Sequence, residues 1–159
     1  MHHPFHIDLR NLSAEGKDIS GSEQPSFFDL SPEDTVQPLS PLTYQLHLEK
    51  DAEDIIITGR LEALFRLECG CCLEPFEFRL VMENYLAEIP VETNGMINLT
   101  DTIREDTLVA LPSYPRCEDG NVRPRQCPAE GKFEPAPETV AVETENAGRG
   151  VWDALNKLN

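Results

Sequence analysis

The sequence predicts an α+β protein with a mostly antiparallel sheet, built around one long hairpin, with one packed helix and a mobile C-terminal tail. Three observations support this class. Residues 55–69 and 76–82 alternate apolar and polar side chains, as half-buried strands do. A short turn of Cys, Gly and Pro residues joins these two segments, which indicates an antiparallel hairpin. Residues 98–111 instead repeat their apolar side chains at helical spacing.

The segments before the hairpin are short or irregular in pattern. Residues 5–9 alternate and predict a short strand, and residues 43–49 alternate again and predict a longer one. Between them, residues 13–26 are polar and rich in Gly and Ser, and residues 25–41 contain four prolines. Because proline removes a backbone donor and fixes φ, we expect an irregular connection there.

The apolar face of the hairpin changes phase along its second strand. Apolar side chains occupy mostly odd positions in residues 55–69 and even positions in residues 76–82. After Glu83 the apolar set moves to Tyr85, Ala87 and Ile89, so the alternation slips by one residue. A bulge or the end of the strand is expected at this point.

The helix is expected over residues 98–111. Asn98 or Thr100 can cap its start, and Pro112 ends it. Its expected core-facing residues are Leu99, Ile103, Thr107 and Ala110 or Leu111.

The chain has the length of one ordinary domain, which we expect to span residues 1–131 with its core in residues 43–127. Residues 113–131 hold three prolines and two glycines, and they open a segment that we expect to be mobile. We expect residues 132–150 to be a flexible acidic linker and residues 151–159 to form a short C-terminal helix.

Charge limits the classes of partner. The formal net charge is −16, from 29 acidic and 13 basic residues. Such a surface repels phosphate backbones and attracts basic partners. The one basic cluster is formed by Arg116, Arg123 and Arg125, in or beside the loop between the last two cysteines.

Several function classes lack their sequence signals. No stretch approaches the ~20 apolar residues of a membrane span, and the first residues do not follow the signal-peptide pattern, so a cytoplasmic location and no membrane partner are expected. We find no Gly-rich phosphate loop, no His-Glu-x-x-His and no nucleophile elbow, so we expect no enzymatic activity.

The five cysteines are the strongest chemical signal. Cys69 and Cys72 lie three residues apart at the predicted hairpin turn, a spacing typical of a zinc knuckle, and Cys117 and Cys127 can complete four ligands for one zinc ion if their loop folds back. A redox pair is the second reading, although Pro75 and a strand follow the motif where redox motifs have a helix. In the third reading, these cysteines are small turn residues that bind nothing.

The order of these segments resembles the YceD family, the large ribosomal RNA subunit accumulation proteins of bacteria. The resemblance covers roughly residues 43–127, with further similarity at residues 7–9 and 152–158. Where the family usually has Arg before its second cysteine, this chain has Cys71. The matching residues are Cys69 to Cys72, then Ile103, Arg104, Glu105 and Asp106 running to Leu111 and Pro112, then Cys117 and Cys127.

The resemblance implies a non-catalytic factor in large ribosomal subunit assembly and large rRNA accumulation. The acidic composition favours binding of a basic ribosomal protein or a pre-ribosomal particle. The alternative is a zinc-dependent RNA-binding module that contacts rRNA directly. We expect the hairpin turn and the helix to form one surface. The residues expected to bind a partner are Arg104, Glu105, Asp106, Arg116, Arg123, Arg125 and Trp152.

Overall fold

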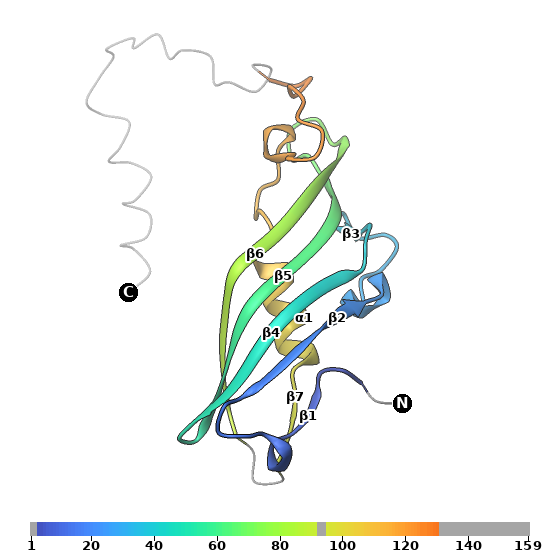
Figure 1. Ribbon diagram of the computed structural model, residues 1–159. Coiled ribbons are helices and arrows are strands. Elements are labelled where there is room, and N and C mark those ends of the chain that lie inside the picture. Colours follow the sequence, from blue (N-terminus) through green and yellow to red (C-terminus); the bar gives the residue numbers. More distant parts are fainter. Residues whose placement is uncertain (1–2, 92–94, 131–159) are drawn as a thin grey trace, which may run out of the picture.

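The computed structural model describes residues 3–91 and 95–130. Within these ranges the chain forms antiparallel strands and one α-helix, which confirms the α+β class (Figure 1). The predicted linker and C-terminal helix, and the mobility expected of the tail, lie outside the described residues.

The main sheet is antiparallel throughout and is arranged around one central strand. The central strand β5 (Asp54–Glu68) has β6 (Pro75–Pro90) on one side and β4 (Leu42–Asp51) on the other. β2 (Lys17–Glu23) lies outside β4, and the two-residue β3 (Gln37–Pro38) continues the β4 side of β5. The smaller elements are β1 (His6–Asp8) paired with β7 (Met96–Asn98), the helix α1 (Thr100–Val109), and the 3-10 turns η1 (Leu9–Asn11), η2 (Pro25–Phe28) and η3 (Cys117–Asp119).

The bulge expected after Glu83 is present. Gly59 pairs with Tyr85 and Leu61 pairs with Met82, so the single residue Arg60 faces two residues of β6. This extra residue moves the later part of β6 into a new phase, which brings the Tyr85 side chain into the core, where only 3 % of it is exposed.

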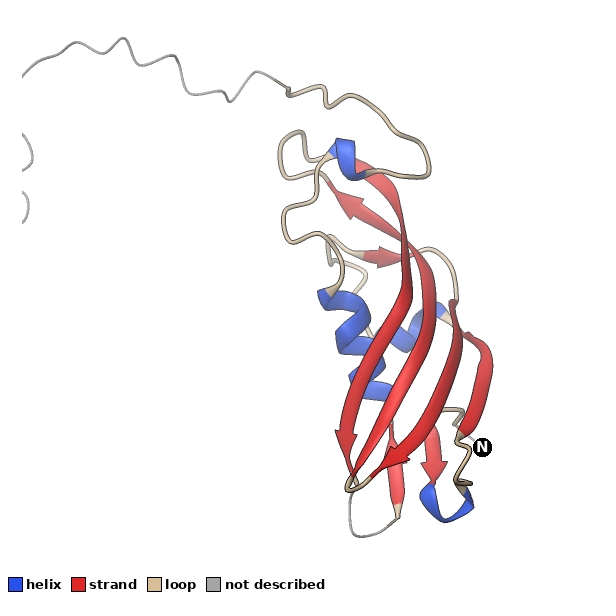
Figure 2. Ribbon diagram, turned by 60° about the vertical axis from the view of Figure 1, so that its left-hand side comes forward, coloured by secondary structure: helices blue, strands red, loops and turns tan. Residues whose placement is uncertain are grey.

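The core lies between one face of the sheet and α1 (Figures 1 and 2). β5 buries its odd-numbered apolar residues, as the alternation predicted. From α1 and its flanks, Leu99, Ile103, Thr107 and Leu111 are buried, whereas Ala110 is exposed. The Thr107 hydroxyl donates to the Ile103 carbonyl at 2.6 Å, which satisfies this buried polar group within the helix.

The N-cap of α1 is Leu99, which makes no side-chain cap, so the predicted caps Asn98 and Thr100 lie one residue before and one residue after that position. The Asn98 side chain accepts a hydrogen bond from the Thr100 N–H at 3.0 Å. It thereby satisfies one of the free donors at the helix start.

The longest strand that the sequence patterns did not predict is β2, and the short β3 and β7 were not predicted either. Within the polar segment 13–26, β2 pairs with β4 over its whole length. β2 has no apolar alternation because it lies at the edge of the sheet and none of its residues is buried. Backbone hydrogen bonds pair β2 with β4, and these bonds do not depend on the type of side chain. The amino-acid pattern therefore does not reveal this strand.

Gly59 is required by the central strand pairing. Its φ is +148°, and a Cβ there would overlap the backbone carbonyl oxygen of Gln45 in β4. We predict that Gly59→Ala lowers the free energy of unfolding by at least about 2 kcal/mol. Gly70→Ala is the matched control, because its Cβ would meet only Pro115 O at 3.5 Å. Denaturant unfolding of both variants gives the comparison, and equal losses in stability would contradict this role.

Candidate metal centre

The turn between β5 and β6 holds the first two cysteines of the site. The Leu73 N–H donates to the Cys69 carbonyl at 2.9 Å, and the Cys69 N–H donates to the Glu74 carbonyl at 3.0 Å. Leu73 has a φ of +61°, a left-handed conformation that closes the turn within a few residues. Cys69 and Cys72 are therefore held at the end of a rigid hairpin.

Residues 113–130 fold back on this turn, in place of the mobile segment expected from their composition. The Gly70 N–H donates to the Pro115 carbonyl at 2.8 Å. The Asn121 side chain bonds both the N–H and the carbonyl of Arg79 in β6, at 2.7 and 2.8 Å, as a paired strand residue would. These contacts join the loop to the turn itself and to β6.

A short 3-10 turn positions the third cysteine. The Arg116 N–H donates to the Asp119 carboxylate at 2.8 Å, and the Gly120 N–H donates to the Cys117 carbonyl at 3.2 Å. A Cβ on Gly120 would lie 3.3 Å from the Phe76 ring, so glycine permits the close approach of η3 to β6.

Four sulfur atoms converge between the turn and the loop. Cys69 Sγ lies 3.8 Å from Cys127 Sγ, and Cys72 Sγ lies 3.5 Å from Cys117 Sγ. All four lie within 4.8 Å of one another. A tetrahedral zinc ion with bonds of about 2.3 Å separates its sulfur ligands by roughly 3.8 Å. The four cysteines predicted as metal ligands therefore lie close enough together to bind one metal ion.

The site is protected from solvent and its thiols differ in acidity. Cys69, Cys117 and Cys127 are buried and Cys72 is half-buried. Burial alone raises the pKa of the Cys69 thiol, but the backbone N–H groups of Cys72, Cys71 and Cys117 together lower this pKa to about 6. Burial and the neighbouring Cys72 thiol raise the pKa of Cys117 to about 12. A thiolate already favoured at Cys69 would give a metal ion its first ligand, and binding would then displace the remaining protons.

Disulfide chemistry is less consistent with this geometry. All five cysteines are free, and the sulfur separations are much longer than the ~2.05 Å of a disulfide bond. Cys69 and Cys72 precede a strand, so no helix N-terminus stabilises either thiolate. Cys71 contributes only its backbone N–H, which donates to Cys69 Sγ at 3.4 Å, and it is not one of the four converging residues.

Of the three arginines near the site, Arg125 is tied to it most directly. Its guanidinium pairs with Glu74 at 3.1 Å, and the nearby Cys117 sulfur, more than Glu74, raises the pKa of Arg125. In contrast, Arg123 makes no hydrogen bond or ion pair with any described residue. No sequence pattern indicates that Arg125 lies beside the Cys117 sulfur, because composition does not record the path of the loop between these two residues.

The candidate partner residues of α1 lie apart from the metal centre. In Figure 1, α1 follows the middle of the sheet, whereas the turn and loop lie at its upper end. Arg104 is committed to internal contacts, donating to the Phe27 carbonyl at 2.7 Å and pairing with Asp101 at 3.0 Å. Asp106 accepts a hydrogen bond from the Tyr85 hydroxyl at 2.7 Å. Glu105 is exposed, and Trp152 lies outside the described residues.

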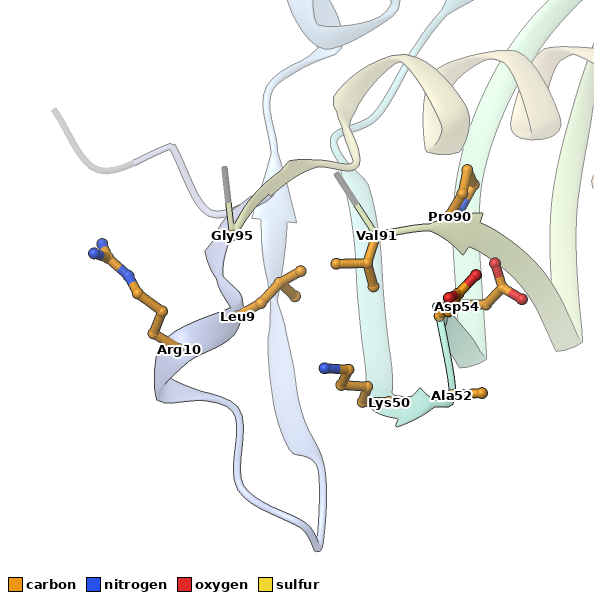
Figure 3. A pocket seen from close by; sticks show the side chains of 9 residues that line it. Leu9, Arg10, Lys50, Ala52, Asp54, Pro90, Val91 and Gly95 are labelled. Atoms are coloured by element: carbon orange, nitrogen blue, oxygen red, sulfur yellow. The ribbon is translucent and has the colours of Figure 1, made fainter. Parts of the chain in front are cut away.

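A cavity of about 740 Å³ lies at the other end of the hairpin, beside the turn between β4 and β5 (Figure 3). Arg10, Lys50 and Asp54 are among its lining residues, and Arg10 is already paired with Asp8 at 2.8 Å. The cavity is wide open and its charged groups do not converge on one point (Figure 3). No sequence pattern indicates this cavity.

Comparisons with models of known protein families, with curated proteins and with solved structures find no match to this chain. In the described part of the chain, no helix is both long and apolar enough to cross a membrane.

We predict that the chain binds one zinc ion, and that cobalt substitution gives the visible absorption of a tetrahedral thiolate site. Replacing Cys69, Cys72, Cys117 or Cys127 by Ser should lower the affinity at least tenfold, because each removes one thiolate. Because protons compete for the same thiolates, the affinity should fall as the pH is lowered. Cys71→Ser is the matched control and should bind normally. Equal losses in all five variants would contradict this ligand set.

Proposed function

We propose that this protein is a non-catalytic factor in large ribosomal subunit assembly that binds a basic ribosomal protein, and that a structural zinc ion on Cys69, Cys72, Cys117 and Cys127 holds its hairpin turn and loop together. The observation that most strongly supports the structural zinc ion is the convergence of the four sulfur atoms. The place in ribosome assembly rests on the resemblance of the cysteine turn and acidic helix to the YceD family.

The donor set favours zinc in a structural role. Four thiolates are the ligands of closed zinc sites, in which the protein fills every coordination position. A closed site leaves no position for a substrate or an activated water, so it supports folding of the loop and not hydrolysis. With four thiolates the centre carries two net negative charges, and the Arg125 guanidinium beside Cys117 offsets part of them.

The charge of the chain favours a basic protein partner. With 29 acidic and 13 basic residues, electrostatic steering brings a positively charged protein to this surface faster than a neutral one. Many acidic side chains, including Glu105, are exposed and therefore available to such a partner.

A second candidate function is direct contact with rRNA at the metal centre. Tyr114 is 88 % exposed and precedes the arginine cluster, and an exposed aromatic ring beside arginines is a platform on which an unpaired base can stack. The acidic residues of the same region, Glu74, Glu118 and Asp119, oppose this second function.

Salt-dependent binding separates the two functions. The zinc-loaded full chain is titrated with basic proteins extracted from large ribosomal subunits, and separately with fragments of large rRNA, at low and at physiological ionic strength. We predict saturable binding of one or more of the basic proteins and no specific binding of RNA. Glu105→Lys should weaken the protein binding several-fold without unfolding the chain, because Glu105 makes no contact in the core.

The matched variant for RNA binding is Arg123→Glu, which should leave protein binding unchanged. Tight RNA binding that Arg123→Glu abolishes, without any binding of basic proteins, would contradict the proposal and favour the second candidate function.

A further inference from the structure

The strand β6 forms an open edge of the main sheet. It has 16 residues, and among residues 3–91 and 95–130 it pairs with β5 alone. Figures 1 and 2 show β6 at the border of the sheet next to α1. Such an edge presents backbone donors and acceptors that another extended chain can pair with.

The loop that completes the metal centre covers only the first half of this edge. The Asn121 side chain bonds the backbone N–H and the backbone carbonyl of Arg79, so these two backbone groups point away from β5. In an antiparallel ladder, residues whose backbone groups point to the paired strand alternate with residues whose backbone groups point outward. When the register shift at the bulge is included, the backbone N–H and carbonyl groups of Val81, Leu86 and Glu88 point to the free edge.

Beside the uncovered half lies a shallow groove between β6 and the last turn of α1. Its volume is about 370 Å³, and Tyr85, Leu86, Asp106 and Val109 are among its lining residues. Leu86 is 67 % exposed and Val109 is 82 % exposed, although both are large apolar side chains. The hydrogen bond from the Tyr85 hydroxyl to Asp106 fixes the helix against the strand, so the groove is preformed.

The charge around this edge selects its occupant. Residues 81–90 carry two acidic side chains, α1 carries three, and the single basic side chain of the two segments, Arg104, is paired with Asp101. A second copy of the chain pairing through β6 would bring the Glu88 carboxylates and the acidic α1 helices of both copies close together, which is unfavourable, whereas Glu83 is already paired with Arg60 at 3.0 Å. A strand with alternating basic and apolar residues would instead place positive charges against these carboxylates.

We propose that the edge of β6 from residue 85 to residue 89, together with this groove, binds an extended basic segment of a partner protein by adding it to the sheet as a further strand. The backbone groups of Leu86 and Glu88 provide the pairing, and Val109, on the α1 side of the sheet, contacts the apolar side chains of the partner strand. This inference rests on the proposed function, because it specifies how a basic ribosomal protein would bind.

The test uses a ten-residue peptide of alternating Lys and Val, capped at both ends, added to the zinc-loaded full chain. Amide hydrogen exchange measured by NMR reports whether the outward N–H groups become bonded. We expect exchange at Leu86 and Glu88 to slow at least tenfold on saturation with the peptide. A peptide of the same sequence with its four central amides N-methylated should give no protection, because it lacks the donors for pairing.

Matched variants test whether the groove contributes. Leu86→Lys with Val109→Lys adds two positive charges and removes two exposed apolar side chains, and it should weaken peptide binding at least tenfold. Leu39→Lys with Tyr114→Lys makes the same change at the exposed residues Leu39 and Tyr114 of other segments, and it should bind the peptide as the unmodified chain does. Equal affinities of the two double variants, or protection that appears away from residues 85–89, would overturn the inference.

Two further outcomes would also overturn it by identifying another occupant. If Leu86 and Glu88 are already protected in the free chain, and Trp152→Ser with Leu155→Ser removes this protection, the edge holds the chain's own C-terminal segment. If the protection grows with protein concentration, the edge pairs with a second copy.

Binding of proteins from large ribosomal subunits separates this inference from the proposed function. If the unmodified chain binds the peptide at β6 but binds none of those proteins, the inference holds and the proposed function fails. If it binds them and the Leu86→Lys, Val109→Lys variant binds them equally well, the proposed function holds and the inference fails.

Discussion

The antiparallel pairing of β5 with β6 is the constraint on which the rest of the structure depends. It places Cys69 and Cys72 at a closed turn, and it sets the register that brings Tyr85 against α1. Among the described residues it also leaves one edge of β6 without a neighbouring strand, and the loop covers part of that edge through Asn121. A slip of one residue in this register would turn every buried side chain of β6 to solvent. The bulge opposite Arg60 is therefore a functional part of the hairpin, since it orients the two halves of β6 differently.

The metal centre extends the hairpin with a loop that has little apolar surface of its own. Residues 113–130 bury Cys117 and Cys127 but few larger apolar side chains, so packing alone contributes little to holding them. Four thiolates around one cation would supply that stability locally, as in other small closed zinc sites. Cys69 has a pKa of about 6 while Cys117 has a pKa of about 12, so the free site keeps some of its protons until a cation replaces them. In the proposed function, the metal centre would hold the fold together, and the groove beside β6 would be open to a partner.

Sequence patterns predicted the elements whose side chains carry the signal. Alternation along β5 and helical spacing in α1 follow from burial of one face, so both elements and the bulge after Glu83 could be predicted. The edge strand β2 and the ordered loop 113–130 depend on backbone pairing and on contacts such as Asn121 with Arg79, which composition does not record. The four cysteines could be named from spacing at the turn, but their convergence depends on that loop folding back. The roles of Arg104 and Asp106 were not predictable, because Phe27 and Tyr85 are distant in sequence.

The central claim is that four cysteine sulfurs from the hairpin turn and the loop bind one zinc ion. X-ray absorption at the zinc edge, on full-length protein purified without a chelator, measures this coordination directly. The structure predicts a first shell of four sulfur atoms at about 2.3 Å and no nitrogen or oxygen ligand. A first shell with nitrogen or oxygen atoms, or with only two sulfurs, would contradict the claim, because the turn and the loop would then not share one metal ion.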